Sequence, residues 1–398
     1  MTDNNENKVL NVPHLRFPEF SGEWEMVSLQ DIATINPKSD PLQNTFIYID
    51  LEAVEKGELR KIQEIMREEA PSRAQRVIDN NDILFQCVRP YQKNNYIHRI
   101  LNTSNQQWVA STGYAQIRTT ELPNYIYHLL NTDEFNRKVM VRCTGSSYPA
   151  INSEDLATIH LYYTPDKKEQ LKISRLLDLL DKRIATQNKI IEKLQSLIKG
   201  LSQQLLSSEN DWILYRLDDL AQIKSGYSGT QVSYQTPYKV SRIETISKHC
   251  IDIQRIGYVE CIPESYRLNV GNILFSNINS IQYIGNTAYL DKDYGLYHGM
   301  NLLRIIPNTT IVRPRFLHLL LCTDWAINHF QTICNKAVSQ ASINQTALGK
   351  SRFPIPPMSV QQQICSMFEL TERKLDNEQE YISCLQQQKR YLLQKMFI

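Results

Sequence analysis

The stretch WEMVSLQDIATI, Trp24–Ile35, returns in the second half of the 398-residue chain as WILYRLDDLAQI, Trp212–Ile223. Both phrases carry Trp, Leu, Asp, Ala and Ile at the same positions. Three more pairs of segments follow in the same order and at nearly the same offset: NNDILF with VGNILF, PNYIYHLLNTDEF with PRFLHLLLCTDWA, and GSSYPAINSEDL with AVSQASINQTAL. Small drifts of the offset are what loop insertions produce. The sequence therefore predicts one architecture duplicated.

Each copy ends in a pattern typical of a long amphipathic helix. Prolines precede both patterns, in TPDKKEQLKI and in IPPMSVQQQI, and the first helical turn tolerates proline because it needs no amide donor. Apolar residues then recur every seven residues, which predicts helices that pack lengthwise. These seam residues are Ile184, Ile191, Leu194, Ile198, Leu201, Leu205, Leu375, Ile382, Leu385 and Leu392.

Two positions in the helical patterns leave alternatives open. Lys389 stands where the first copy has the apolar Ile198, so it marks either the end of the seam or a choice of register, unless the side chain only extends to solvent. Gly200 either permits a close approach of helices or is simply tolerated.

Short β-type runs alternate with one helical stretch in each globular part, so the expected fold class is α+β. We expect a polar N-terminal segment over residues 1–14. Two tandem α/β domains should span 15–165 and 209–357, each followed by a helical region, at 166–208 and 358–398.

Composition excludes several classes of protein. The polar start lacks an apolar signal region, and no apolar run reaches about 18 residues, so we expect a cytoplasmic protein without membrane spans. The 8 cysteines include no CxxC pair, and the 8 histidines show no ligand spacing. We therefore expect reduced thiols and no metal site.

Motifs for catalysis are missing. QTALGKS resembles the end of a phosphate-binding loop, but Asn344 replaces the glycine that the loop requires. PDKKE, from Pro165, resembles a nuclease carboxylate motif, yet it begins a helix, where acidic residues favour the dipole. The sequence also lacks G-x-S-x-G, HExxH and the Asn-Pro-Pro-aromatic motif of amino-methyltransferases. The chain is predicted to do no chemistry by itself.

The net charge of +2 is unevenly distributed. Residues Ile83–Thr120 and Trp325–Phe368 contain no Asp or Glu, whereas Asp50–Glu69 carries a cluster of acids. Acid-free stretches rich in Asn, Gln, Ser and Tyr suit a surface that lies near phosphate, although a neutral polar surface explains them equally well.

If the surface does lie near phosphate, the candidates for contact with a nucleic acid are the polar segments that follow apolar runs. Asn and Gln can bind adenine, Arg can bind guanine, and Lys and Tyr suit phosphates. In the first copy the candidates are Arg89, Tyr91, Gln92, Lys93, Asn94, Asn95, Tyr96, Ser146, Ser147, Tyr148 and Asn152. In the second copy they are Lys224, Ser225, Tyr227, Arg242, Asn277, Asn279, Lys336, Ser339, Gln340 and Asn344. The alternative for each segment is an ordinary solvated loop or a structural turn.

The order of these features, given twice, resembles the specificity (S) subunit of Type I DNA restriction–modification systems. The resemblance is carried by LRFPEFSGEWEMVSLQDIATI, by the loop GSSYPAIN, by the TPDKKEQLKI junction and by the seamed helices. It runs from about Leu15 to the C-terminus. The second loop departs from the first because it lacks the counterpart of Gly145.

The resemblance implies two target recognition domains, each reading half of a bipartite asymmetric double-stranded DNA target. It implies helices that pack as an antiparallel coiled coil with pseudo-twofold symmetry, set the spacer and dock two methyltransferase (M) subunits. Restriction–translocase (R) subunits complete such complexes. S-adenosylmethionine, ATP and Mg belong to those partners, so this chain is expected to hold no cofactor.

The length of the first helical pattern agrees with a spacer role. Arg183–Leu206 spans about 36 Å as a helix, which is close to one turn of B-DNA. Two rival interpretations stay open. The chain could be a two-headed coiled-coil adaptor that never touches DNA, or a single-chain DNA methyltransferase or nuclease with unrecognised motifs.

Overall fold

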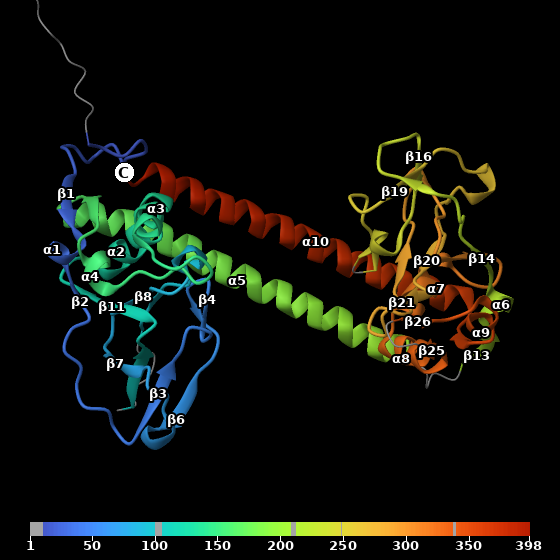
Figure 1. Cartoon of the computed structure of the whole chain (residues 1–398), viewed down its shortest axis with the longest axis horizontal. Coiled ribbons are helices and arrows are strands. Elements are labelled where there is room, and N and C mark those ends of the chain that lie inside the picture. Colours follow the sequence, from blue (N-terminus) through green and yellow to red (C-terminus); the bar gives the residue numbers. More distant parts are fainter. Residues whose placement is uncertain (1–10, 100–105, 208–211, 248, 337–339) are drawn as a thin grey trace, which may run out of the picture. The chain divides into compact units, whose positions relative to one another are not determined.

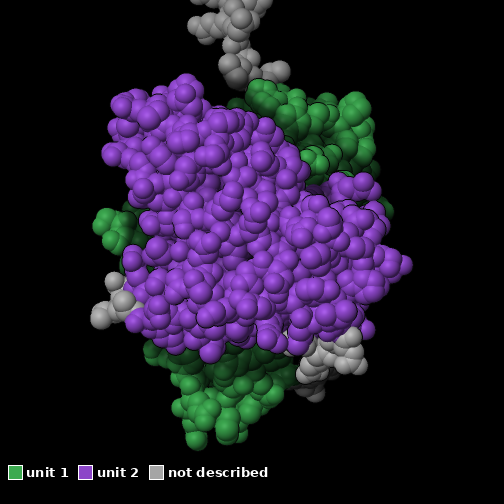
Figure 2. All heavy atoms as spheres, turned by 90° about the vertical axis from the view of Figure 1, so that its right-hand side faces the viewer, with its two compact units in different colours: residues 1–188, 380–398 green, residues 189–379 purple. Residues whose placement is uncertain are grey.

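A computed structural model of the chain describes residues 11–99, 106–207, 212–247, 249–336 and 340–398. The chain divides into two compact units, residues 1–188 with 380–398 and residues 189–379, which Figure 2 colours separately. Each unit contains one globular head and parts of two long helices, α5 (Lys167–Leu205) and α10 (Met358–Lys395), labelled in Figure 1. None of the helices described combines the length and the apolarity needed to cross a membrane.

The head of unit 1 contains two four-stranded sheets, ordered β2-β11-β8-β9 and β6-β3-β10-β7, and the strand pairs β1-β12 and β4-β5. Its strands are β1 (Glu25–Ser28), β2 (Ala33–Ile35), β3 (Thr45–Ile49), β4 (Val54–Glu55), β5 (Glu58–Leu59), β6 (Gln63–Met66), β7 (Ala74–Ile78), β8 (Ile83–Gln86), β9 (Tyr96–Ile97), β10 (Gln107–Ser111), β11 (Tyr114–Thr119) and β12 (His160–Tyr163). Its helices are α1 (Leu29–Ile32), α2 (Pro123–Leu130), α3 (Asp133–Arg142) and α4 (Ser153–Ala157).

The head of unit 2 contains sheets ordered β14-β24-β20-β22, β15-β19-β16-β23 and β21-β26-β25, and the strand pairs β13-β27 and β17-β18. Its strands are β13 (Ile213–Arg216), β14 (Ala221–Ser225), β15 (Gln231–Val232), β16 (Tyr238–Val240), β17 (Ile246–Ser247), β18 (Cys250–Ile251), β19 (Gly257–Val259), β20 (Ile273–Phe275), β21 (Ile278–Asn279), β22 (Thr287–Tyr289), β23 (Leu296–Tyr297), β24 (Leu303–Pro307), β25 (Asn335–Lys336), β26 (Ala341–Ser342) and β27 (Arg352–Ile355). Its helices are α6 (Leu217–Leu220), α7 (Pro314–Leu321), α8 (Asp324–Ile333) and α9 (Gln345–Gly349).

The two heads repeat one topology. The sheet β2-β11-β8-β9 of the first head corresponds strand by strand to the sheet β14-β24-β20-β22 of the second. In each sheet the first edge strand, β2 or β14, contains the end of the repeated phrase. The second sheet of each head holds one parallel pair, β3 with β10 and β16 with β23, whereas its edge strands differ. The predicted duplication of an α/β architecture is therefore confirmed, and the divergence lies at sheet edges and loops.

The repeated phrase recurs because it fills the two cores. Leu29 and Leu217 are fully buried at equivalent positions, and Ala33 and Ala221 are buried beside them. Burying a leucine side chain stabilises a fold by roughly 1.5–3 kcal/mol, so replacement at these sites is costly. Trp24 packs edge-to-face on Tyr125 at 6.3 Å in the first head.

The two long helices pack against each other within each unit, as the seam predicted. In unit 1, contacts run in opposite directions along the chain: Asp181 of α5 pairs with Lys389 of α10, whereas Arg183 lies over the Tyr381 ring. The helices are therefore antiparallel there. In unit 2, Leu201 and Leu205 pack on the cluster that includes Ile364, Cys365 and Phe368. Of the seam residues, Ile382 and Leu385 are buried and the others are half-buried.

Two open questions about the helices are answered by the structure. Lys389 Nζ lies 2.5 Å from Asp181 Oδ1 on α5, so it forms an ion pair across the helices instead of ending the seam. Gly200 is exposed, and a Cβ added there would meet nothing within 4 Å. The glycine is therefore tolerated and not required for packing.

Replacing Gly200 by alanine should stabilise the protein. A mid-helix glycine costs about 0.5–1 kcal/mol relative to alanine, and the new methyl group has room. Urea unfolding would measure the gain.

Gly226→Ala is the contrasting variant, because its Cβ would lie 1.8 Å from the carbonyl oxygen of Gly299. This change should lower stability by about 2–3 kcal/mol. A loss of stability in Gly200→Ala would contradict the assignment of an open helix surface.

Candidate nucleic-acid interface

In the first head, two segments far apart in sequence form one polar face. The backbone of Arg89 adopts the left-handed conformation, with φ of 55°, and its N–H donates to the carbonyl of Pro149 at 2.8 Å. Ile151 N–H donates to Cys87 O at 3.1 Å on the other side of this contact. The segment after β8 is thus held against the loop that precedes α4.

That loop is closed by two backbone hydrogen bonds between Thr144 and Ala150, each 2.9 Å long. Gly145 lies in the turn with φ of 90°, a conformation that favours glycine. The turn places the ring of Tyr148 under the Arg89 guanidinium, 4.3 Å from the ring centroid. A stacked arginine keeps its planar edge available for a base or a phosphate.

The first reading face consists of the half-buried Arg89 and the exposed Tyr91, Gln92, Ser146, Ser147 and Tyr148. Gln92 Oε1 also accepts from Gln86 Nε2 at 3.0 Å. Tyr91 and Tyr148 expose 51% and 63% of their surface. Such exposed rings, next to an arginine and small hydroxyl side chains, suit contacts with a sugar–phosphate backbone and base edges.

Other predicted residues of the first head have structural partners. Asn95 and Tyr96 are buried, and Asn95 accepts a hydrogen bond from Gln86 N–H at 2.8 Å. Lys93 pairs with Asp133 at 2.6 Å, and Asn94 accepts from Lys56 N–H at 3.0 Å. These four side chains shape the turn, and we leave them out of the first reading face.

Asn152 and Asn344 have the same role in the two heads. Asn152 is the N-cap of α4 and accepts from Asp155 N–H at 2.7 Å, and Asn344 is the N-cap of α9 and accepts from Ala347 N–H at 2.7 Å. An N-cap satisfies an otherwise unpaired helix donor, which explains why both copies keep asparagine.

In the second head, the small sheet β21-β26-β25 brings predicted residues together. Asn279 pairs with Ala341, and Ala341 pairs with Lys336 on the other side. Lys336 and Gln340 are exposed, whereas Ser339 lies outside the described residues. The segment after β20 thus meets the segment after α8, as the segment after β8 meets the segment after α3 in the first head.

Asn277 is the most unusual of these residues. Its backbone carbonyl accepts from Ile343 N–H at 2.9 Å, and its side-chain Oδ1 is buried without a hydrogen-bond partner among the residues that the structure describes. Asn279 uses its amide on Ser276 and Ser280. Lys336, Gln340 and the half-buried Asn277 and Asn279 form the second reading face.

Four other predicted residues of the second head lie outside the small sheet β21-β26-β25. Lys224 and Ser225 are exposed at the end of β14, whose Ile223 carbonyl accepts from Gln345 Nε2 of α9 at 2.6 Å. Arg242 pairs with Glu244 at 3.4 Å. Tyr227 packs edge-to-face on Tyr266, with ring centroids 5.3 Å apart.

The glycine in the turn before Tyr227 has a structural reason. Gly226 lies where a Cβ would collide with Gly299, and Gly299 likewise abuts the carbonyl of Ser241. Lys224 and Ser225 differ from Tyr227 and Arg242 because no contact of their side chains is described. They lie next to α9.

Arg76 is a residue that the sequence reasoning missed. Its Nε is buried and has no hydrogen-bond partner within the described part of the chain, and burial lowers the pKa of its guanidinium. The charge of Arg76 acts on the Cys87 thiol, two residues before Arg89, so it lies near the first reading face. The only signal in the sequence was an arginine inside the apolar strand AQRVI, Ala74–Ile78.

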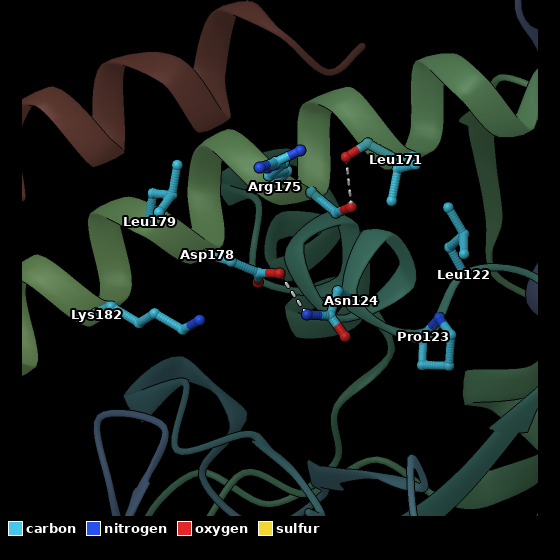
Figure 3. Close-up of a pocket in the computed structure, with 9 residues that line it drawn as sticks. Leu122, Pro123, Asn124, Leu171, Arg175, Asp178, Leu179 and Lys182 are labelled. Carbon is cyan, nitrogen blue, oxygen red and sulfur yellow. Dashed lines mark hydrogen bonds between the residues drawn. The ribbon is translucent and has the colours of Figure 1, made fainter.

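A hollow of about 440 Å³ in unit 1 lies between α2 and α5 (Figure 3). Its lining combines exposed leucines with cations: Leu122, Pro123, Asn124, Leu171, Ser174, Arg175, Asp178, Leu179 and Lys182. Leu171 and Leu179 expose 56% and 57% of their surface. Within the described ranges, no group of three His, Cys, Asp or Glu side chains is arranged to hold a metal ion.

Comparisons with solved structures give the same fold. A chain from a structure on complex assembly and conformational transition of the type I R-M system matches with a TM-score of 0.60 at 19% identity, over 94% of this chain and 97% of that one. The crystal structure of the S subunit of a Type-I restriction-modification system from M. genitalium matches with a TM-score of 0.60 at 14% identity, over 97% and 99%.

Sequence relatives match about half of the chain. The putative type I restriction enzyme MjaX specificity subunit of Methanocaldococcus jannaschii is 38% identical over 193 residues, 47% of this chain and 45% of the relative. The HindI specificity subunit of Haemophilus influenzae is 23% identical over 186 residues, 46% and 37%. Each match thus spans less than half of the relative's length.

The family model of the Type I restriction modification DNA specificity domain matches twice, over residues 21–196 and 209–387. Each match covers one head and most of the long helix that follows it, in agreement with the duplicated topology of the two units. The chain therefore belongs to the family of Type I restriction modification DNA specificity domains and contains two of them.

Proposed function

We propose that this chain is the sequence-reading subunit of a Type I restriction–modification complex, in which each head reads one half of a bipartite, asymmetric DNA target. The observation that carries the proposal is the repeated juxtaposition of two polar segments in both heads. In each case a segment after a central strand, β8 or β20, is joined to the loop before a capped short helix, α4 or α9.

The scaffold under these faces is alike in the two heads, and the faces themselves differ. The first presents Arg89 stacked on Tyr148, and the second presents Lys336 and Gln340 beside Asn277 and Asn279. Arginine reads guanine through O6 and N7, and glutamine and asparagine read adenine through N6 and N7. Different side chains on one scaffold support two different half-sites.

The long helices act as the spacer. A helix of 39 residues is about 58 Å long, and part of its seam is covered within each unit. A stiff connection between two reading heads fixes the number of base pairs between the half-sites.

Two methyltransferase subunits dock, in this proposal, on the outer faces of the helices. Leu179 of α5 and Leu370 of α10 expose 57% and 60% of their surface. They follow the two helix starts, Lys167 and Met358, by the same number of residues, and each has an exposed cation, Lys182 or Arg373, three residues on. Equivalent apolar and basic patches suit two copies of one partner, with an apolar and acidic contact surface.

The chemistry lies in the partners. Methyl transfer with S-adenosylmethionine, and cleavage with ATP and Mg by restriction–translocase subunits, are assigned to them, and the chain itself is non-catalytic. Methyl transfer by the purified chain alone would instead identify a single-chain methyltransferase. A complex without salt-dependent DNA binding would identify an adaptor.

Exchange of one head tests the proposal directly. Replacing residues 24–152 by the same segment of a relative should change one half of the methylated motif and leave the other half and the spacing unchanged. Genome-wide mapping of methylated adenines gives both halves in one experiment. Changes in both half-sites would show that recognition is not divided between the heads.

Arg89→Ala should weaken methylation of the native target by about 5–100-fold and relax the preference at one base of the first half-site, because one bidentate base contact is worth about 1–3 kcal/mol. Tyr148→Ala should have a smaller effect, because it removes only the ring under the guanidinium. Methylation rates on targets varied base by base would measure both. Arg216→Ala, an exposed arginine paired with Asp218 in the other head, is the control. Equal loss at every base position would assign Arg89 to a phosphate.

Leu179→Asp and Leu370→Asp should each reduce binding of one methyltransferase copy, and the double variant should bind none. A charge in the apolar patch opposes burial, whereas an exposed site leaves the fold intact. Co-purification with mass determination of the complex would count the bound copies. Leu197→Asp, at an exposed leucine of α5 outside these patches, is the control. Full binding by the double variant would exclude this surface.

A further inference from the structure

One buried glutamine near the start of each long helix connects that helix to its head. Gln170 of α5 and Gln361 of α10 have no exposed surface. Gln170 Oε1 accepts from the backbone N–H of Leu122, the residue before α2, at 3.3 Å. Gln361 Oε1 accepts from the backbone N–H of Arg313, the residue before α7, at 2.8 Å.

The amide nitrogen of each glutamine binds the segment that enters the long helix. Gln170 Nε2 donates to Thr164 O at 2.8 Å and to Glu121 Oε2 at 2.7 Å. Gln361 Nε2 donates to Pro356 O at 2.9 Å and to Ile311 O at 3.0 Å. Each side chain thus bridges the start of a head helix and the start of a long helix. Rotation of one against the other would leave buried polar atoms unpaired, which is costly.

A second polar contact joins each head helix, α2 or α7, to its long helix, further from the start of the long helix. In unit 1, Asp178 of α5 accepts from Asn124 Nδ2 (Figure 3) and lies 2.9 Å from Nε2 of the buried His128. In unit 2, Arg315 of α7 pairs with Glu372 of α10. Burial alone would raise the pKa of Asp178, but the hydrogen bonds from His128 and Asn124 outweigh it and hold the pKa below its ordinary value.

We propose that Gln170 and Gln361 are positioning residues that fix the orientation of each head on its long helix, so that the complex accepts one spacer length and rejects its neighbours. This inference rests on the proposed function, in which the helices set the distance between half-sites. A head that hinged on its helix would carry its reading face along the DNA. A displacement of about 3.4 Å corresponds to one base pair, so a small hinge motion is enough to admit a wrong spacer.

The test uses the complete methyltransferase complex with Gln170→Leu, Gln361→Leu or both. Its substrates carry both native half-sites and differ only in spacer length. Wild type should prefer one spacer, and each variant should keep the same half-site bases. The ratio of methylation rates between the native spacer and its neighbours should fall by about 10-fold per variant, the size expected for the loss of one or two buried hydrogen bonds.

Gln363→Leu, at an exposed glutamine of α10, is the matched control and should leave the ratio unchanged. A merely structural role would lower methylation by the same factor at every spacer, and that result would overturn the proposal. If wild type itself shows no pair of half-sites at a preferred spacing, it is the proposed function that fails.

A second variant keeps the proposal testable if the leucine variants do not fold or lose their partner. His128→Leu removes the contact with Asp178 from inside the head, and Leu319 is the second head's residue at the aligned position. His128 does not line the hollow of Figure 3, so partner binding should be retained. The same broadening of spacer preference is expected, and an unchanged ratio in this folded variant would overturn the proposal.

Discussion

The apolar seam of the long helices constrains the rest of the chain. A single amphipathic helix in water is marginal, so each stretch of α5 must be covered by a stretch of α10 that runs the other way. Unit 1 therefore has to combine residues 1–188 with 380–398. The residues that follow α10 complete the first core, where Phe397 packs on Trp24 and Tyr125 with ring centroids 6.0 Å and 5.6 Å apart.

Apolar packing in the seam does not by itself choose one geometry, because leucine and isoleucine side chains tolerate small shifts. Polar contacts select one of these arrangements. Lys389 binds Asp181 across the helices of unit 1, and Gln170 and Gln361 tie each head to its helix. Buried polar groups often contribute more to a unique geometry than to stability, because only one arrangement satisfies them. The spacer role proposed for the long helices needs that property.

The reading faces, in contrast to these buried contacts, tolerate changes of side chain. They lie on loops that a repeated sheet carries, so their side chains can change without disturbing the core. Leu29 and Leu217 stay alike because both are fully buried, whereas Arg89 and its counterparts in the second head differ. One duplicated fold can in this way carry two unrelated recognition surfaces.

The sequence by itself determined the duplication, the α/β class of each head and the two helices, whose predicted ranges differ from the observed ones by no more than a few residues. These features follow from periodic patterns, and periodicity is local information. It could not show that Asn152 and Asn344, both predicted to contact DNA, have side chains that cap α4 and α9. Nor could it show that Asn95 is buried, that Lys389 meets Asp181, or that Gln170 and Gln361 bridge a head and a helix. Each of these depends on a partner distant in sequence or on burial by other elements, and only the tertiary structure decides which polar side chains are left to face a ligand.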